Sequence, residues 1–310
     1  MIVKVNNLVK RYGAMIALDH FNLEIQEGEI FGLLGPNGSG KTTAMNCILS
    51  LLQYDKGEIE IFGKKMRADS NDIKRQIGVV LQNVAVFDEL TVYQNIDYFC
   101  SLYVSDKKER KRLVEEAIGF VELGEFRKFC PKKLSGGLLR RLNIACGIAH
   151  KPKLIFLDEP TVAVDPQSRN KILEGIQRLN REGATIIYTS HYMEEVEQIC
   201  TRIVIMDKGR NLAIGTKEEL KAMIRTGDTI SVNILDLPEA VMKELKELPH
   251  VFELTYENQV LVVKCSKGKH NLIRVLDTLK KNEVYFGSVF SSLPTLNDVF
   301  LEITGTELRD

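Results

Sequence analysis

One stretch near the N-terminus has the residue types and spacing of a phosphate-binding loop. It matches the pattern G-x-x-x-x-G-K-[ST] and consists of Gly35, Pro36, Asn37, Gly38, Ser39, Gly40, Lys41, Thr42 and Thr43. Glycines let the loop curl so that backbone N–H groups face phosphate oxygens. Lys41 would reach the β- and γ-phosphates, and Thr42 would bind Mg²⁺ through its hydroxyl. The stretch therefore predicts a nucleotide site.

Two adjacent acids follow an apolar segment, residues 154–157. Asp158 would lie at the carboxyl end of a buried strand, where P-loop enzymes hold magnesium. Glu159 would point to the other side of the strand end and could take a proton from attacking water, as a general base. Gln82 ends another apolar segment and could offer its amide to Mg²⁺ and the water. His191 could donate a hydrogen bond to the γ-phosphate. Taken alone, Gln82 and His191 would be read as structural.

A second candidate anion site is the run Leu134-Ser135-Gly136-Gly137-Leu138. It combines a serine hydroxyl, glycine N–H groups and the start of a predicted helix, whose N-terminus attracts anions. One chain does not easily need two such sites for one phosphate group. Two chains packed head to tail can each supply half of a composite site.

These residues follow apolar segments of the kind that form buried strands. The expected strands are residues 30–34, 77–81, 153–157 and 184–189. Helical segments alternate with them, including one after the phosphate loop and one that Asp165 and Pro166 would begin as N-cap and first residue. Residues 21–26 and 58–61 alternate apolar and polar side chains and predict half-buried strands. The pattern predicts an α/β domain with a mixed sheet.

Helical spacing replaces this pattern from about residue 91 to 137, which predicts a helical subdomain within the α/β domain. Its charged run at residues 107–112 is expected to be a solvated helix face rather than a site for lipid head groups. From about residue 227 the order β-α-β-β-α-β predicts a small ferredoxin-like α+β domain. We therefore expect domains at 1–226 and 227–310. The second shows no catalytic constellation.

The composition is that of a globular protein. Among 310 residues, 44% are hydrophobic, and the formal net charge of +0 gives no support for nucleic-acid binding. The 6 cysteines are scattered and are expected to be buried thiols. The start is unlike a signal peptide, and no apolar run approaches the ~20 residues that span a bilayer. We expect a cytosolic protein whose membrane role, if any, needs a partner chain.

Together these motifs resemble the nucleotide-binding subunit of an ATP-binding cassette (ABC) transporter. The phosphate loop, Gln82, the 134–137 signature, Asp158–Glu159, the loop around Asp165 and His191 occur in the family's order within residues 1–225. The resemblance implies a P-loop fold with an antiparallel β subdomain and a helical subdomain. It also implies that Tyr12 stacks on adenine and that Ser135, Gly136 and Gly137 contact ATP bound to a second cassette.

Three further segments, 140–143, 164–169 and 294–301, look like those of single-domain ATPases from drug, antibiotic, sodium or polysaccharide exporters. This implies ATP hydrolysis with Mg²⁺, and a dimer of cassettes, identical or paralogous. It also implies a separate multi-spanning permease that would hold the chain at the inner face of the cell membrane. Two positions depart from the family pattern. Leu138 replaces a frequent Gln, and Ala163 replaces a usual Gly. If Ala163 needs φ > 0, it costs roughly 1 kcal/mol or more.

Three alternatives compete with the transport function. The first is a soluble, non-transport cassette ATPase such as a translation or repair factor. Members of that group usually carry two cassettes or long insertions, and neither feature occurs here. The second is a nucleotide-dependent regulatory or resistance module without sustained turnover, which the Ala163 departure leaves open. The third is a small-molecule P-loop kinase, which has no use for the Ser135 signature.

Overall fold

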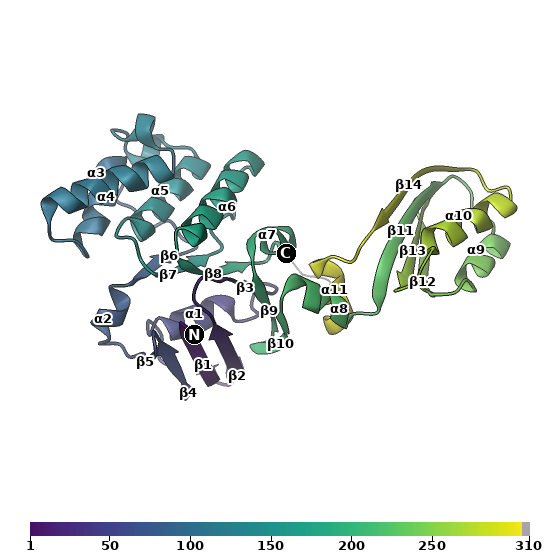
Figure 1. Cartoon of the computed structure of the whole chain (residues 1–310), viewed down its shortest axis with the longest axis horizontal. Helices are drawn as coiled ribbons and strands as arrows, with labels where there is room; N and C mark the ends of the chain where they lie inside the picture. The colour runs from purple at the N-terminus through teal and green to yellow at the C-terminus, as the bar shows by residue number, and fades with distance from the viewer. Residues whose placement is uncertain (306–310) are drawn as a thin grey trace. The chain divides into compact units, whose positions relative to one another are not determined.

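The computed structural model describes residues 1–305 and divides the chain into two compact units (Figure 1). The first is Met1–Thr216, and the second begins at Lys217. The boundary between the units lies before the one predicted between residues 226 and 227, because helix α8 (Lys217–Met223) packs against α11 (Leu296–Thr304) within the second unit. Residues 306–310 of the predicted second domain lie outside the described residues. No helix in the described part has the length and apolar character needed to cross a membrane.

The first unit contains a six-stranded sheet in the order β10-β9-β3-β8-β7-β6. Its strands are β3 (Ile30–Leu34), β6 (Ile77–Val80), β7 (Leu154–Asp158), β8 (Thr185–Ser190), β9 (Arg202–Asp207) and β10 (Arg210–Gly215). Neighbouring strands are parallel except β10, which is antiparallel to β9. The carboxyl ends of parallel strands share one edge, so residues that follow β3, β6, β7 and β8 gather there.

An antiparallel sheet in the order β2-β1-β4-β5 supports the phosphate loop. Its strands are β1 (Val3–Tyr12), β2 (Met15–Ile25), β4 (Lys56–Ile61) and β5 (Lys64–Lys65). As the alternation predicts, Phe21, Leu23 and Ile25 are buried while Asn22 and Glu24 are exposed. Side chains of this sheet, of β3 and of helix α1 (Lys41–Ile48) form one apolar core. The loop between β3 and α1 is therefore anchored at both ends.

The predicted helical subdomain is present, built from α3 (Val92–Ser101) and α4 (Lys107–Phe120), which pack on α5 (Gly136–Ile148). Thr91 and Gln94 cap α3 reciprocally, and Asp106 caps α4. The other helices of the first unit are α2 (Asn71–Lys74), α6 (Pro166–Arg181) and α7 (Met193–Ile199). Asp165 caps α6 with Pro166 at its first position, as predicted. All six cysteines are unpaired, and all but Cys130 are buried.

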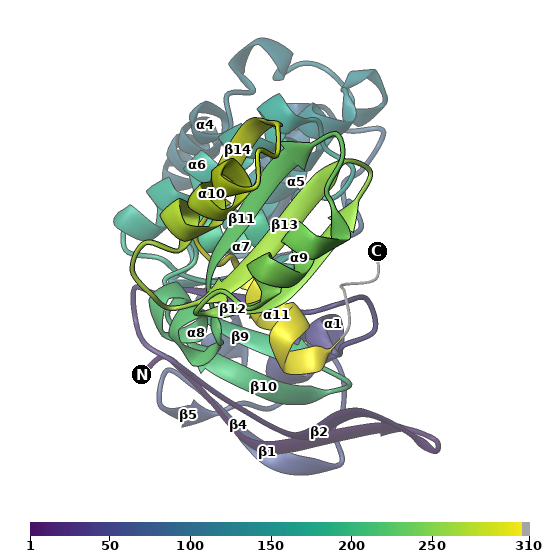
Figure 2. The same ribbon diagram turned by 90° about the vertical axis from the view of Figure 1, so that its right-hand side faces the viewer.

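The second unit has the predicted β-α-β-β-α-β order. Its elements are β11 (Thr226–Ile234), α9 (Glu239–Lys246), β12 (Val251–Glu257), β13 (Val260–Ser266), α10 (Asn271–Lys281) and β14 (Phe286–Ser292), with α8 and α11 in addition. The sheet order is β12-β13-β11-β14, and every neighbouring pair is antiparallel. Helices α9 and α10 cover one face of the sheet (Figure 2) and enclose an apolar core with it. This is the split βαβ arrangement of a ferredoxin-like domain.

Candidate nucleotide-hydrolysis site

The predicted phosphate loop connects β3 to α1, and its shape depends on glycine. Gly40 has a φ of 105°, which side-chain-bearing residues rarely adopt. A Cβ on Gly35 would lie 2.3 Å from the carbonyl oxygen of Met206. The loop curls around Lys41, whose Nζ donates hydrogen bonds to the carbonyl oxygens of Gly35 (2.8 Å) and Pro36 (3.1 Å). Lys41, Thr42 and Thr43 form the start of α1, so the positive end of this helix faces the loop.

Thr42 and Asp158 meet at the base of this loop. The Thr42 hydroxyl donates to Oδ2 of Asp158 over 3.1 Å. Asp158 is only 2% exposed, and burial raises the pKa of its carboxyl group. Burial also lowers the pKa of Lys41. The buried hydroxyl of Ser39 has no hydrogen-bond partner within residues 1–305. A buried carboxylate and a hydroxyl are oxygen ligands of the kind that magnesium prefers, together with water and phosphate oxygens, so these residues fit a magnesium–nucleotide complex.

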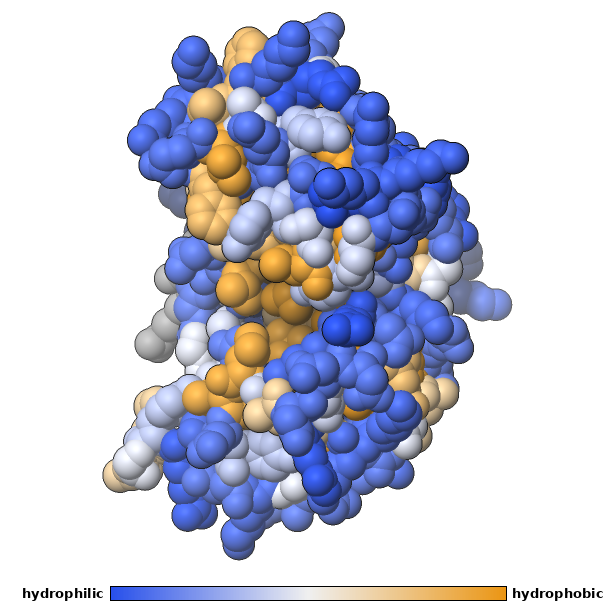
Figure 3. Space-filling model, turned by 90° about the vertical axis from the view of Figure 1, so that its left-hand side faces the viewer, coloured by the Kyte–Doolittle hydropathy of each residue, from blue (hydrophilic) through white to orange (hydrophobic). Residues whose placement is uncertain are grey.

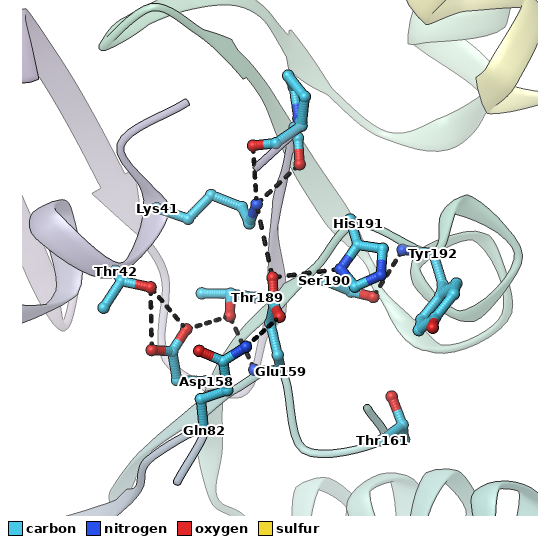
Figure 4. Close-up of polar contacts among 12 residues, drawn as sticks. Lys41, Thr42, Gln82, Asp158, Glu159, Thr161, Thr189, Ser190, His191 and Tyr192 are labelled. Atoms are coloured by element: carbon cyan, nitrogen blue, oxygen red, sulfur yellow. Dashed lines mark hydrogen bonds and ion pairs between the residues drawn. The ribbon is translucent and has the colours of Figure 1, made fainter. Parts of the chain in front are cut away.

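Glu159 is the point where the other predicted residues converge (Figure 4). Gln82 donates from Nε2 to Oε2 of Glu159 over 2.9 Å. On the other oxygen, Oε1, the ring Nδ1 of His191 lies at 3.3 Å and the ammonium of Lys41 at 3.7 Å. The structure thus brings Lys41, Gln82, Glu159 and His191 together. Gln82 contacts Glu159 rather than the Thr42–Asp158 pair, with which it was predicted to share a metal ion.

Thr189, which the sequence analysis did not single out, holds the two acids apart. Its hydroxyl donates to Oδ1 of Asp158 (2.6 Å) and accepts from the backbone N–H of Glu159 (3.0 Å). Asp158 is thereby fixed beside Thr42, while the chain turns at Glu159, whose φ is 46°. The only sequence signal for Thr189 is a hydroxyl residue near the end of an otherwise apolar strand.

The signature segment lies elsewhere in the chain. Ser135 is the N-cap of α5, and its hydroxyl accepts from the N–H of Leu138 over 3.4 Å. Gly137 packs so closely on the start of α6 that a Cβ there would lie 2.4 Å from Oγ of Ser168. Among the described residues, no hydrogen bond or ion pair joins Ser135, Gly136 or Gly137 to the phosphate loop. One chain therefore does not bring its two candidate anion sites together.

Two other predicted features have a clear place in the structure. Tyr12 ends β1 and is 46% exposed. Its ring therefore lies at the surface rather than in the core, and the ammonium of Lys10 is 5.0 Å from the ring centroid. Ala163 has a φ of 59°. Because this φ is positive, an alanine here costs free energy that the family's usual glycine would not.

A phosphate loop between β3 and α1, two acids at the end of β7 and a helical subdomain define a P-loop ATPase of the ATP-binding cassette class. Family models give the same result. The model described as "ABC transporter" matches residues 18–162. The model described as "ATP-binding protein DrrA1-3-like, C-terminal domain" matches residues 215–304.

Curated relatives match over nearly their whole length. The Linearmycin resistance ATP-binding protein LnrL of Bacillus subtilis is 36% identical, with 100% of both chains covered. A Daunorubicin resistance ATP-binding protein of Streptomyces coeruleorubidus is 32% identical, covering 99% of this chain and 97% of the relative. The Nod factor export ATP-binding protein I of Ralstonia nicotianae is 31% identical, covering 100% and 95%.

Among solved structures, a dimeric ATP-binding cassette in a post-hydrolysis state, bound to ADP and phosphate, is similar with a TM-score of 0.64 and 29% identity. The match covers 69% of this chain and 98% of that one. The chain belongs to the ATP-binding subunits of ABC transporters, in the exporter branch, and it binds and hydrolyses ATP. Such subunits dimerise and work with membrane components. The comparisons give no support to the non-transport, regulatory or kinase alternatives.

Proposed function

We propose that Glu159 is the general base of ATP hydrolysis in this chain. The observation that carries the proposal is the convergence of Gln82, His191 and Lys41 on the two oxygens of the Glu159 side chain. In the proposed step, Glu159 accepts a proton from water as the water oxygen bonds to the γ-phosphorus. The bond from that phosphorus to the bridging oxygen breaks, and ADP and phosphate are the products.

The neighbouring residues bind the phosphates and stabilise charge. Lys41 reaches the transferring phosphoryl group from inside the loop, and His191 does so from the end of β8. Thr42 and Asp158 would hold magnesium, with Gln82 close by, and the bound ion would neutralise charge on the β- and γ-phosphates. Because Lys41 already lies 3.7 Å from Glu159, a γ-phosphate near its ammonium would lie close to the base as well.

The site is completed by a second cassette, identical or paralogous. Ser135, Gly136 and Gly137 of one chain contact ATP that lies in the phosphate loop of the other, while Tyr12 stacks on adenine. Support comes from the position of the signature at the N-terminus of α5, where Ser135 and Gly136 are exposed and a helix start attracts anions. Hydrolysis removes the γ-phosphate that joins the two chains, so the dimer reopens.

A multi-spanning permease is the proposed membrane partner, and export is the proposed direction. Support comes from the relatives named for drug resistance and Nod factor export. One face of the first unit is hollowed between the helical subdomain and the strands, and apolar side chains gather there (Figure 3). Exposed apolar residues of this unit include Leu81 next to Gln82, and Phe87, whose ring lies 4.9 Å from that of Tyr98. A permease bound there would hold the chain at the inner face of the membrane.

The direct test of the base is Glu159→Gln. The amide keeps the size of the side chain but cannot take the proton. We expect steady-state hydrolysis to fall by about 10²–10⁴-fold, with ATP affinity changed by less than about twofold. The exposed Glu182→Gln is the matched control and should hydrolyse ATP at the wild-type rate. Normal turnover in Glu159→Gln would contradict the role of Glu159.

The composite site is tested in the Glu159→Gln background with size-exclusion chromatography. ATP and magnesium should convert the chain to a dimer. Adding Ser135→Asp keeps an N-cap acceptor for Leu138 but places a negative charge where the partner's γ-phosphate would lie. We expect this double variant to bind ATP as a monomer. An unchanged dimer would contradict the role of the signature.

The permease proposal is tested by co-purification. Failure of the full chain to co-purify with any multi-spanning protein from its own cells would contradict the proposal of a permease partner.

A further inference from the structure

A buried carboxylate outside the catalytic group connects the two segments that flank it. Glu195, on α7, is 3% exposed. Its Oε2 accepts hydrogen bonds from three hydroxyl groups, those of Thr161 (2.7 Å), Tyr188 (2.6 Å) and Ser190 (3.3 Å). Burying a carboxylate is costly unless hydrogen bonds compensate for the lost water. These donors therefore fix both the carboxylate and the backbone that carries them.

Each donor lies within two residues, along the chain, of a residue of the hydrolysis site. Figure 4 shows two of these donors, Thr161 and Ser190. Thr161 is two residues after Glu159 in the chain. Tyr188 and Ser190 lie on either side of Thr189, which bonds both Asp158 and the N–H of Glu159. The network therefore holds the segment after β7 against the end of β8.

Ser190 extends the network to the other side of His191. While its hydroxyl donates to Glu195, the same oxygen accepts from the N–H of Tyr192 over 2.9 Å. The rings of His191 and Tyr192 lie 4.1 Å apart between centroids. Glu195 thus constrains the backbone before and after His191 without touching its imidazole.

The second carboxylate oxygen faces the helix that follows Ala163. Nε of Arg169, in the first turns of α6, lies 3.3 Å from Oε1 of Glu195. Both atoms are buried and neither has a hydrogen-bond partner among the residues that the structure describes, so the ion pair lacks hydrogen-bond geometry. The guanidinium also lies 4.9 Å from the ring centroid of Tyr192. A small shift of α6 would change this contact and reach His191 through Tyr192 and Glu195.

We propose that Glu195 is a positioning residue that sets His191 relative to Glu159 and transmits movement of the 161–169 segment to His191. The inference rests on the proposed roles of Glu159 and His191. A buried carboxylate with donors on two separate segments can couple them, because moving either segment breaks a charge-assisted hydrogen bond.

The test measures kcat and KM for ATP, and ATP affinity, in the full chain. Glu195→Ala should lower kcat at least about tenfold and change ATP affinity by less than about twofold. Glu195→Gln should restore part of the loss because its amide oxygen still accepts hydrogen bonds. Glu194→Ala, an exposed neighbour on the same helix, should match the wild type. If Glu195→Ala does not fold, the test uses Tyr188→Phe instead. This variant removes only a hydroxyl group, and we expect a smaller loss of kcat.

A second background separates positioning from a general structural effect. In His191→Ala, adding Glu195→Ala should lower kcat by less than about twofold, because the lost function already runs through His191. Equal losses of kcat in both backgrounds, or no loss in Glu195→Ala, would overturn the inference while the roles of His191 and Glu159 stand. Wild-type turnover in His191→Ala would contradict the proposed role of His191, and the inference with it.

Discussion

The guanidinium of Arg140, in the helix that begins at the signature, donates a 2.6 Å hydrogen bond to the backbone carbonyl of Gln82. Arg140 is 7% exposed, and burial lowers its pKa. A longer bond of 3.4 Å reaches the carbonyl of Leu81, and Asn143 from the same helix contacts that carbonyl too. Since the side chain of Gln82 bonds Glu159, helix α5 is connected to the carboxylate of Glu159 through one residue.

Replacing Arg140 by Lys should weaken this connection. Lysine keeps the positive charge but is a point donor on a flexible stem, without the planar guanidinium whose Nη1 reaches both carbonyls. We expect kcat for ATP to fall about three- to tenfold with ATP affinity unchanged, because the phosphate loop is not altered. Arg112→Lys is the control, since Arg112 is half exposed and pairs with Glu109 and Glu116 on its own helix. An unchanged kcat in Arg140→Lys would show that the Gln82 backbone is held by other contacts.

Ala163→Gly should stabilise the chain. Ala163 occupies the left-handed region, which costs a residue with a Cβ roughly 1–2 kcal/mol. Glycine removes this cost but adds about 0.4–1 kcal/mol of unfolded-state entropy. The expected net gain is between zero and about 1.6 kcal/mol, or a rise in Tm of a few °C. Ala240→Gly, at an exposed position in helix α9, should instead lower stability by about 0.5–1 kcal/mol. Thermal unfolding of both variants checks the opposite signs, and a lower Tm in Ala163→Gly would rule out strain at this site.

Gly137→Ala should destabilise the contact between α5 and α6. Its Cβ would lie 2.4 Å from Oγ and 2.7 Å from Cβ of Ser168, and such overpacking typically costs about 1–3 kcal/mol. In Gly136→Ala the new Cβ meets only the carbonyl oxygen of Ala163, at 3.9 Å. The free energy of unfolding of this control should therefore lie within about 0.5 kcal/mol of the wild-type value. Denaturant unfolding measures both. Adding Ser168→Gly to Gly137→Ala should recover part of the loss, and no recovery would mean that Ser168 is not the obstacle.

Asp158→Asn should make the nucleotide-free chain more stable at neutral pH. Burial raises the pKa of Asp158 above its ordinary value of 3.8, so the folded chain favours the protonated carboxyl. Its contribution to stability is complete below the unfolded-state pKa and is lost as pH rises through the folded-state pKa. The asparagine, which has no charge to bury, avoids that loss. The gain in Tm should therefore disappear as the pH is lowered toward the ordinary carboxyl pKa.

Asp72→Asn is the control with the opposite sign. A hydrogen bond from Lys64 lowers the pKa of Asp72, so its ionised form favours the folded state. Its substitution should leave Tm unchanged or slightly lower at neutral pH, with no difference at low pH. ATP with magnesium should raise the Tm of the wild type and of Asp72→Asn but not of Asp158→Asn. Equal stabilisation of all three by ATP would contradict the placement of Asp158 at the magnesium site.

Much of the fold could be predicted because its signals are local. The apolar run 30–34, the glycines of the phosphate loop and the N-cap at Asp165 each act within a few residues, through side-chain alternation, backbone freedom and capping. The same holds for the order of elements in the second unit. Its beginning was placed too late because α8 belongs with α11, a contact between segments far apart in the chain.

The sequence by itself determined which residues are suited to phosphate, magnesium and proton transfer, since residue type and short spacing define those capacities. Only the tertiary structure decided which of them meet. Gln82 and Glu159 are 77 residues apart in the chain, and the sheet order β3-β8-β7-β6 brings them within 2.9 Å. The hydroxyl of Thr189 between the two acids, the buried carboxylate of Glu195 and the left-handed Ala163 follow from the same packing. Strand order depends on long-range pairing and burial, which no local pattern records.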